Sequence, residues 1–160
     1  MKTKRGTSMG FLVLDDRTSR LEVSLFSEAF EQYGGKISKD ALLVVEGEIQ
    51  HDEYNGGMAL RASRILTIDE ARQRFGRVLH LDFSSAPLPE DFNKRFRQVV
   101  KKHRASHQAT IEECPILLSY QHAGAVAKIT LGEQWRVQIC ESLLQSLAHA
   151  FGQECISLQY

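Results

Sequence analysis

The chain has 160 residues, in which 20 lysines and arginines are balanced by 20 aspartates and glutamates. This length allows one mid-sized domain or two small ones. The zero net charge excludes a protein that binds nucleic acid by bulk charge alone. Residues 1–75 carry 11 basic and 12 acidic residues, and residues 76–160 carry nine and eight. Neither half is basic overall, so any contact with nucleic acid is confined to a local patch.

The sequence also argues against a membrane-spanning protein and against a disulfide-stabilised one. No apolar run approaches the roughly 18–20 residues of a membrane span, and the N-terminus lacks the apolar core of a signal peptide. The three cysteines, Cys114, Cys140 and Cys155, are odd in number and form no CxxC motif. They are predicted to be reduced structural thiols in a cytosolic chain.

The first half of the chain is predicted to be a small five-stranded barrel. Apolar residues alternate on both sides of the polar turn at 15–20, which indicates a β-hairpin. A short helix follows, with Ser27 as its cap, one face formed by Phe26, Phe30 and Tyr33, and Gly34-Gly35 as its end. In chain order the expected elements are a first strand at 2–5, strands at 9–14 and 21–26, a helix at 27–33, and strands at 41–49 and 58–66. Hairpin, helix, hairpin is the order of an OB-fold barrel.

The second half is predicted to be a small α+β domain with two helices. All three prolines lie beyond residue 86, where the hydrophobic period also changes. The expected elements are a strand at 77–83, a helix at 89–103, strands at 115–121, 125–131 and 135–139, a helix at 143–151, and a closing strand or exposed tail at 155–160. Residues 69–76 are polar and favour a linker, so the predicted domains are 1–75 and 76–160.

Catalytic and metal sites find little support in these residues. Asp15-Asp16 is the type of pair that holds Mg²⁺ in phosphoryl-transfer sites, but its place in a turn favours two solvated charges. His103 and His107 have the spacing of two ligands on one helix face, but no third ligand is suitably spaced. The phosphate-binding, nucleophile-elbow and zinc-protease motifs are absent from the sequence. We therefore expect no catalytic residue, metal or cofactor.

A basic cluster at the start of the chain is the candidate for nucleic-acid binding. In a barrel of this order, the first strand and its loop line the face on which a single strand lies. Such a groove needs cations for the backbone and aromatic side chains for base stacking. The candidate residues are Lys2, Lys4, Arg5, Phe11, Tyr54, Arg61 and Arg64. From the residues alone, a solvated terminus with scattered charges is an equal alternative.

The second half offers candidates for a protein contact. Trp135, the only tryptophan, is more often a core residue than a contact, although tryptophan is enriched at interface hot spots. The tail at 156–160 alternates and ends in Tyr160. It is suited either to pairing in the sheet or to offering apolar residues to a groove in a partner.

The sequence resembles the C-terminal region of the bacterial replicative DNA polymerase III alpha subunit over essentially all 160 residues. The motifs that carry the resemblance are Lys4-Arg5-Gly6, residues 9–16, residues 20–26, Arg61-Ala62, residues 68–72, residues 120–125 and Trp135-Arg136-Val137. The resemblance implies an OB-fold domain associated with single-stranded template DNA. It also implies a C-terminal domain that binds the tau subunit of the clamp loader, with Trp135 and Leu158 as candidate contacts. Tyr160, at the end of the alternating tail, is a third candidate contact, and the sliding clamp is a further candidate partner.

The family's polymerising activity, a nucleotidyl transfer that uses Mg²⁺, belongs to domains that lie upstream of the matching region. The chain is therefore expected to be a non-catalytic C-terminal fragment, or a product cut off from its polymerase, located at the replisome in the bacterial cytoplasm. Met1 stands where the family's first strand is already under way, so that strand is expected to be truncated. The alternative is a stand-alone adaptor with a degenerate OB domain and no DNA binding.

Overall fold

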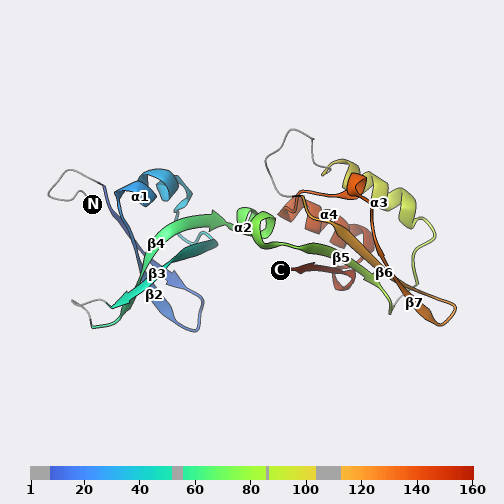
Figure 1. Cartoon of the computed structure of the whole chain (residues 1–160), viewed down its shortest axis with the longest axis horizontal. Coiled ribbons are helices and arrows are strands. Elements are labelled where there is room, and N and C mark those ends of the chain that lie inside the picture. The colour runs from blue at the N-terminus through green and yellow to red at the C-terminus, as the bar shows by residue number, and fades with distance from the viewer. Residues whose placement is uncertain (1–7, 52–55, 86, 104–112) are drawn as a thin grey trace. The chain divides into compact units, whose positions relative to one another are not determined.

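The structure, a computed structural model, describes residues 8–51, 56–85, 87–103 and 113–160 (Figure 1). The chain forms two compact units, Met1–Ile68 and Asp69–Tyr160. The boundary lies earlier than the one expected after residue 75, because helix α2 (Ile68–Phe75) joins the second unit. Arg72 of this helix forms an ion pair with Glu141, and the Asp69 carboxylate accepts a hydrogen bond from the Glu141 amide at 2.9 Å.

The first unit contains a four-stranded sheet in the order β1-β2-β4-β3. Strands β1 and β2 form the expected antiparallel hairpin, and β2 pairs with β4 in parallel. A helix and one 3₁₀ turn lie between β2 and β3 in the chain. The elements are β1 (Gly10–Asp15), β2 (Arg20–Leu25), α1 (Ser27–Tyr33), η1 (Gly34–Lys36), β3 (Leu43–His51) and β4 (Met58–Thr67).

The strand order and pairing match the OB-fold prediction. The described residues form an open sheet without a closed barrel, and the strand expected at 2–5 lies outside them. Helix α1 also differs in detail from its prediction. Phe26 is its N-cap, Ser27 is its first helical residue, and the chain continues through Gly34-Gly35 as a 3₁₀ turn that ends at Lys36.

The core of the first unit lies between the inner face of the sheet and α1. Val23, Leu25, Leu60, Ala62 and Ile65 are buried there, and partly buried side chains such as those of Leu12, Phe30 and Tyr33 pack against them. Alternate residues of β1 and β2 supply this core, as period-2 alternation requires. The other residues of the same strands face away from it.

Gly47 shapes this sheet at the point where the register of β3 against β4 shifts, between Glu46 and Gly47. A Cβ atom on residue 47 would lie 2.2 Å from the carbonyl oxygen of Arg61. No real side chain tolerates that distance, so the close approach of the two strands requires glycine here. The backbone around Arg61 therefore depends on this glycine.

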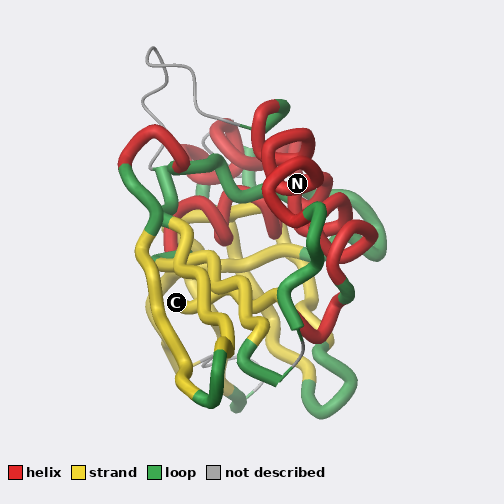
Figure 2. Tube along the Cα trace, turned by 90° about the vertical axis from the view of Figure 1, so that its right-hand side faces the viewer, coloured by secondary structure: helices red, strands yellow, loops and turns green. Residues whose placement is uncertain are grey.

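The second unit contains a second four-stranded sheet, in the order β7-β6-β5-β8, with two helices on one face (Figures 1 and 2). Strand β5 pairs in parallel with β6 and antiparallel with β8. The closing segment is therefore a strand. The elements are β5 (Val78–Phe83), α3 (Phe92–Lys101), β6 (Ile116–His122), β7 (Ala125–Thr130), η2 (Glu133–Trp135), α4 (Glu141–Phe151), η3 (Gln153–Cys155) and β8 (Ile156–Gln159).

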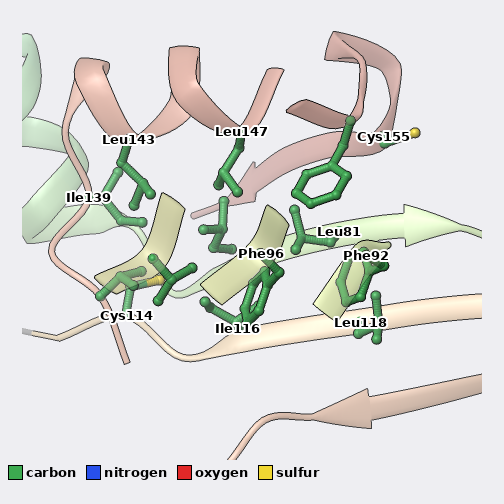
Figure 3. Close-up of a cluster of buried hydrophobic side chains, with 14 of the residues drawn as sticks. Leu81, Phe92, Phe96, Cys114, Ile116, Leu118, Ile139, Leu143, Leu147 and Cys155 are labelled. Atoms are coloured by element: carbon green, nitrogen blue, oxygen red, sulfur yellow. The ribbon is translucent and has the colours of Figure 1, made fainter. Parts of the chain in front are cut away.

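The core of this unit lies between the two helices and the sheet. Leu143 and Leu147 project from α4 towards Leu81 and Ile116 of the central strands (Figure 3). Both helices carry the apolar spacing read from the sequence, which brings one stripe of each onto the sheet. The second unit thus has its own hydrophobic core, as expected.

One predicted strand of the second unit is wrong. Residues 135–139 form no strand; instead Trp135 ends the 3₁₀ turn η2, and Val137 makes a single bridge to Cys114. Val137 and Ile139 are nonetheless buried. The alternation in this segment reflects burial of an extended chain and not a ladder of hydrogen bonds.

Among the helices built from described residues, none is long and apolar enough to cross a membrane.

Candidate nucleic-acid interface

The outer face of the first sheet, which points away from its core, carries the candidate site. On β1 the side chains of Phe11 and Val13 are 67% and 57% exposed, whereas Leu12 and Leu14 pack against the core. These two large apolar side chains lie on the same face of β1 and are largely accessible to solvent. Apolar surface of this kind marks a binding surface when it forms a patch.

Cross-strand pairing extends this face over three further strands. Phe11 lies opposite Ser24 of β2, Ser24 lies opposite Arg61 of β4, and Arg61 lies opposite Glu48 of β3. One row of side chains thus runs across the whole sheet. It contains one aromatic ring and one guanidinium group, which are the two groups that stack on nucleobases.

Phe26 adds a second exposed ring to this face. It follows Leu25 at the end of β2, is 41% exposed, and lies under the guanidinium group of Arg61 at 4.5 Å from ring centroid to Cζ. Helical spacing alone assigns Phe26 to one face with Phe30 and Tyr33. Phe26 also continues the alternation that runs through Ser24, and this is the signal in the sequence that points to its place on the sheet.

Shallow hollows lie on both sides of Phe26. The first, of about 250 Å³, is lined by Phe11 and Phe26 together with Met9, Glu22, Val23, Ser24, Gln50, His51 and Ala59. The second lies between Phe26, Arg61 and the start of α1, where Glu28, Ala29 and Gln32 line it. A third hollow lies against Arg61 on its other side, next to Glu48.

The face is poor in positive charge. Among the described residues that line the three hollows, Arg61 is the only lysine or arginine, and Glu22, Glu28 and Glu48 are carboxylates. Phosphate groups bound here would gain little from Coulomb attraction. What the face offers instead is the exposed rings of Phe11 and Phe26.

The other predicted DNA-binding residues are placed less favourably or are not described. Arg64 forms an ion pair with Glu46 at 3.1 Å, with both side chains about one third exposed. It lines none of the three hollows. Lys2, Lys4, Arg5 and Tyr54 lie outside the described residues, so the predictions for them stay predictions.

The predicted partner-binding residues of the second unit differ in exposure. Trp135 packs against the core of its unit, with its ring centroid 5.4 Å from that of Phe96. Leu158 of β8 is partly buried against the same core. Tyr160 is 71% exposed. Two of the three side chains therefore contribute to folding, and the third is accessible to a partner.

The carboxylate pair Asp15-Asp16 lies in the turn of the first hairpin. The side chain of Thr18 and the backbone amides of Ser19 and Thr18 donate hydrogen bonds to Asp16, and these bonds lower the pKa of Asp16 to about 2. Asp15 forms an ion pair with Arg20 at 2.8 Å. Both side chains thus serve to close the hairpin, as the turn interpretation predicts.

Groups that could hold a metal ion, three or more histidine, cysteine, aspartate or glutamate side chains together, do not occur among the described residues. The Nδ1 atom of His103 lies 3.7 Å from the Cys140 thiol, and His107 is outside the described ranges. Burial raises the pKa of the Cys114 and Cys155 thiols.

Comparison with known proteins finds a different family match in each of the two units. Residues 1–68 match the family described as an OB-fold nucleic acid binding domain. Residues 95–152 match the family described as the C-terminal domain of DNA polymerase III subunit alpha. Over its whole length the chain is 40% identical to the DNA polymerase III alpha subunit of Pseudomonas aeruginosa, and 36% identical to those of Vibrio cholerae and Escherichia coli K12.

The chain is related throughout to the C-terminal region of DNA polymerase III alpha subunits. It spans about 13% of the length of these relatives. The resemblance read from the sequence is thereby confirmed, and so is the mixed class of the fold, an OB-fold domain followed by an α+β domain.

Proposed function

We propose that this chain binds single-stranded DNA through the outer face of its first sheet, as the C-terminal part of a replicative polymerase. The observation that carries the proposal is the cluster of Phe11, Phe26 and Arg61 on the exposed face of an OB-fold sheet. Aromatic rings and guanidinium groups stack on bases of any sequence. A template strand of variable sequence needs this kind of contact.

A titration of a fluorescent oligo(dT) strand at low salt tests this proposal. The double variant Phe26→Ala, Arg61→Ala is expected to bind the strand about tenfold more weakly, since base stacking contributes roughly 1–3 kcal/mol per base. Val126→Ala, at an exposed position of β7, is the matched control. Charge reversal at Lys4 and Arg5 tests the basic cluster in the same assay. Wild-type protein that binds no oligonucleotide would favour the adaptor alternative, in which the OB domain is degenerate.

For the second unit we propose a contact with the tau subunit of the clamp loader, with the sliding clamp as a further candidate. The similarity of residues 95–152 to the alpha C-terminal domain supports this, and Tyr160 supplies exposed aromatic surface. Tyr160→Ala is expected to weaken capture by immobilised tau while leaving stability unchanged. Trp135→Ala is expected to weaken tau capture and also to lower the stability of the fold, because the Trp135 ring packs on Phe96. Tau capture unaffected by Tyr160→Ala would contradict the contact.

We propose that both activities need no cofactor and that the chain acts at the replisome in the bacterial cytoplasm. Binding of oligo(dT) is then expected to be the same in EDTA and in Mg²⁺. The polymerase reaction itself, with its Mg²⁺ requirement, would reside in the remainder of a full-length alpha subunit.

A further inference from the structure

We propose that helix α3 of the second unit binds the phosphate backbone of duplex DNA through a basic stripe on its solvent-facing side, formed by Lys94, Arg97 and Lys101. This inference concerns a different unit from the proposed single-strand binding and does not depend on it. It gives the second unit a nucleic-acid contact in addition to the proposed contact with tau.

The basic stripe follows from the spacing of residues on α3. Residues at i, i+3 and i+7 share one side of a helix, so Lys94, Arg97 and Lys101 project together. All three are exposed, whereas buried residues of the same helix, such as Phe96, face the core. At about 1.5 Å of rise per residue, the stripe is about 10 Å long. That length covers about three phosphate spacings of about 3.4 Å along one strand of a duplex.

The fold does not use the charges of the basic stripe. Within the described part of the chain, no carboxylate forms an ion pair with any of its three side chains. By contrast, Arg95 of the same helix is held by Asp91 at 2.7 Å and by the carbonyl oxygen of Ala150 at 3.3 Å. The ten residues of α3 include no aspartate or glutamate. The three cations are therefore available to an anion from outside the unit.

Two common reasons for basic residues on a helix do not account for this stripe. A cation in the last turn stabilises the helix dipole, which is a reason for Lys101 but not for Lys94. Lys94 lies in the first turn, where the dipole disfavours a positive charge. A face that serves only as solvated surface usually mixes positive and negative charges. The single sign of this stripe is a cost to α3 itself, and a bound phosphate would offset it.

Trp135 positions the central cation of the stripe. The Cζ atom of Arg97 lies 5.6 Å from the centroid of the Trp135 ring, which in turn packs against Phe96. A guanidinium group stacked on a ring keeps its N–H groups free to bind a phosphate. The exposed carboxylate next to Trp135, that of Glu133, is paired with Arg136 at 3.3 Å. A side chain of the core thus holds Arg97 at the surface.

The composition of the stripe favours duplex DNA over an acidic protein or a single strand. Protein interfaces depend on apolar or aromatic anchors, but the remaining position on this side of α3 is the polar Gln98. A single strand exposes its bases, which require aromatic surface for stacking. A duplex presents its phosphates outward, and phosphate contacts need only cations and polar donors.

Titration of the chain with a short, blunt-ended fluorescent duplex at several salt concentrations tests the proposal. Three phosphate contacts give a slope of about −2.7 for log K against log salt, so wild type should lose about fortyfold between about 50 and 200 mM salt. The triple variant Lys94→Gln, Arg97→Gln, Lys101→Gln should bind at least tenfold more weakly at low salt. Its slope should be smaller in magnitude by about two to three.

The charge-matched control is the triple variant Lys39→Gln, Arg77→Gln, Lys128→Gln, which removes three exposed cations from other elements. It should change the affinity for the duplex by less than threefold. Thermal unfolding shows whether each variant is folded. If the triple variant of the stripe unfolds, Lys94→Gln alone takes its place, and its salt slope should be smaller in magnitude by about one.

Three outcomes would overturn the proposal. Wild type would bind no duplex, or the stripe variant and its control would bind the duplex equally well. The stripe variant would lose more affinity for oligo(dT) than for the duplex, which would indicate a single-strand contact. Or it would keep its affinity for the duplex and lose capture by immobilised tau, which would indicate a protein contact. Failure of the proposed single-strand binding looks different, since wild type would then bind the duplex but not oligo(dT).

Discussion

Each unit of this chain contains a four-stranded sheet, but the outward faces of the two sheets differ in the side chains that they expose. In the first unit the outward face exposes Phe11 and Phe26, and Arg61 covers only one side of Phe26. In the second unit the face away from the helices carries a hydrogen bond of 2.7 Å between His80 Nε2 and the nearly inaccessible Ser119 hydroxyl. On the second face His80 and Ser119 bind each other and Val126 is exposed, whereas on the first face the rings of Phe11 and Phe26 leave much of their surface open to solvent. The first face therefore leaves aromatic side chains accessible, and it is the one for which binding is proposed above.

The largest expected effect separates core from surface. Leu147→Ala removes a fully buried side chain from the second unit, so the free energy of unfolding of that unit should fall by about 2–5 kcal/mol. Phe11→Ala changes an exposed side chain and should alter stability by less than about 0.5 kcal/mol. Urea unfolding measures both, with the fluorescence of Trp135 reporting the second unit. Equal losses of stability for the two variants would contradict the assignment of Leu147 to the core and of Phe11 to the surface.

Gly47→Ala should destabilise the first unit by about 1–3 kcal/mol, because the added Cβ atom forces β3 away from the Arg61 carbonyl. Gly57→Ala is the matched control, since a Cβ atom on that residue meets nothing within 4 Å. Thermal unfolding followed by circular dichroism measures the difference. If both variants melt at the same temperature, the close approach of the strands is not needed.

Ser119→Ala tests the second face. Removal of the hydroxyl breaks the bond to His80 and should cost about 0.5–1.5 kcal/mol of stability. Ser157→Ala, at an exposed position opposite His80 in the neighbouring strand, should cost less. Oligonucleotide binding should be unchanged in both variants. A loss of DNA binding in Ser119→Ala alone would show that the second face, too, meets the strand.

The smallest effect concerns pH. The folded pKa of Asp16 is about 2, below the ordinary value of 3.8, so its hydrogen bonds stabilise the first hairpin fully above pH 3.8. This stabilisation is lost as the pH falls from 3.8 through 2. Asp16→Asn should therefore flatten the pH dependence of the melting temperature in that window, as followed by circular dichroism. Identical curves for wild type and Asp16→Asn would contradict the turn's role.

The sequence predicts those parts of the fold and of the candidate site that depend on contacts between residues close together in the chain. The two faces of β1 follow from local alternation, and the helix at 27–33 follows from its spacing. Phe26 is ambiguous because it satisfies both patterns: it is two residues beyond Ser24 on the strand and four residues before Phe30 on the helix. Only the packed structure decides between them.

Longer-range contacts are beyond the reach of local patterns. Val137 and Ile139 alternate as in a strand, but a strand also needs a neighbouring segment that pairs with it along its length. Here Val137 makes only a single bridge to Cys114, which the local sequence does not reveal. The unit boundary lies earlier than the polar linker suggests for a similar reason. Asp69 and Arg72 meet Glu141, which is distant in the sequence, and nothing in a polar helical segment indicates which unit it will join.

The contact between Asp69 and Glu141 also determines where the chain can be cut. Cys140, the N-cap residue of α4, makes no side-chain capping bond, and the Asp69 carboxylate takes over that role for the Glu141 amide. Capping bonds contribute about 0.5–2 kcal/mol. A fragment that begins at residue 76 would start α4 without its cap. Separate expression of the two units is therefore best served by a division between Ile68 and Asp69.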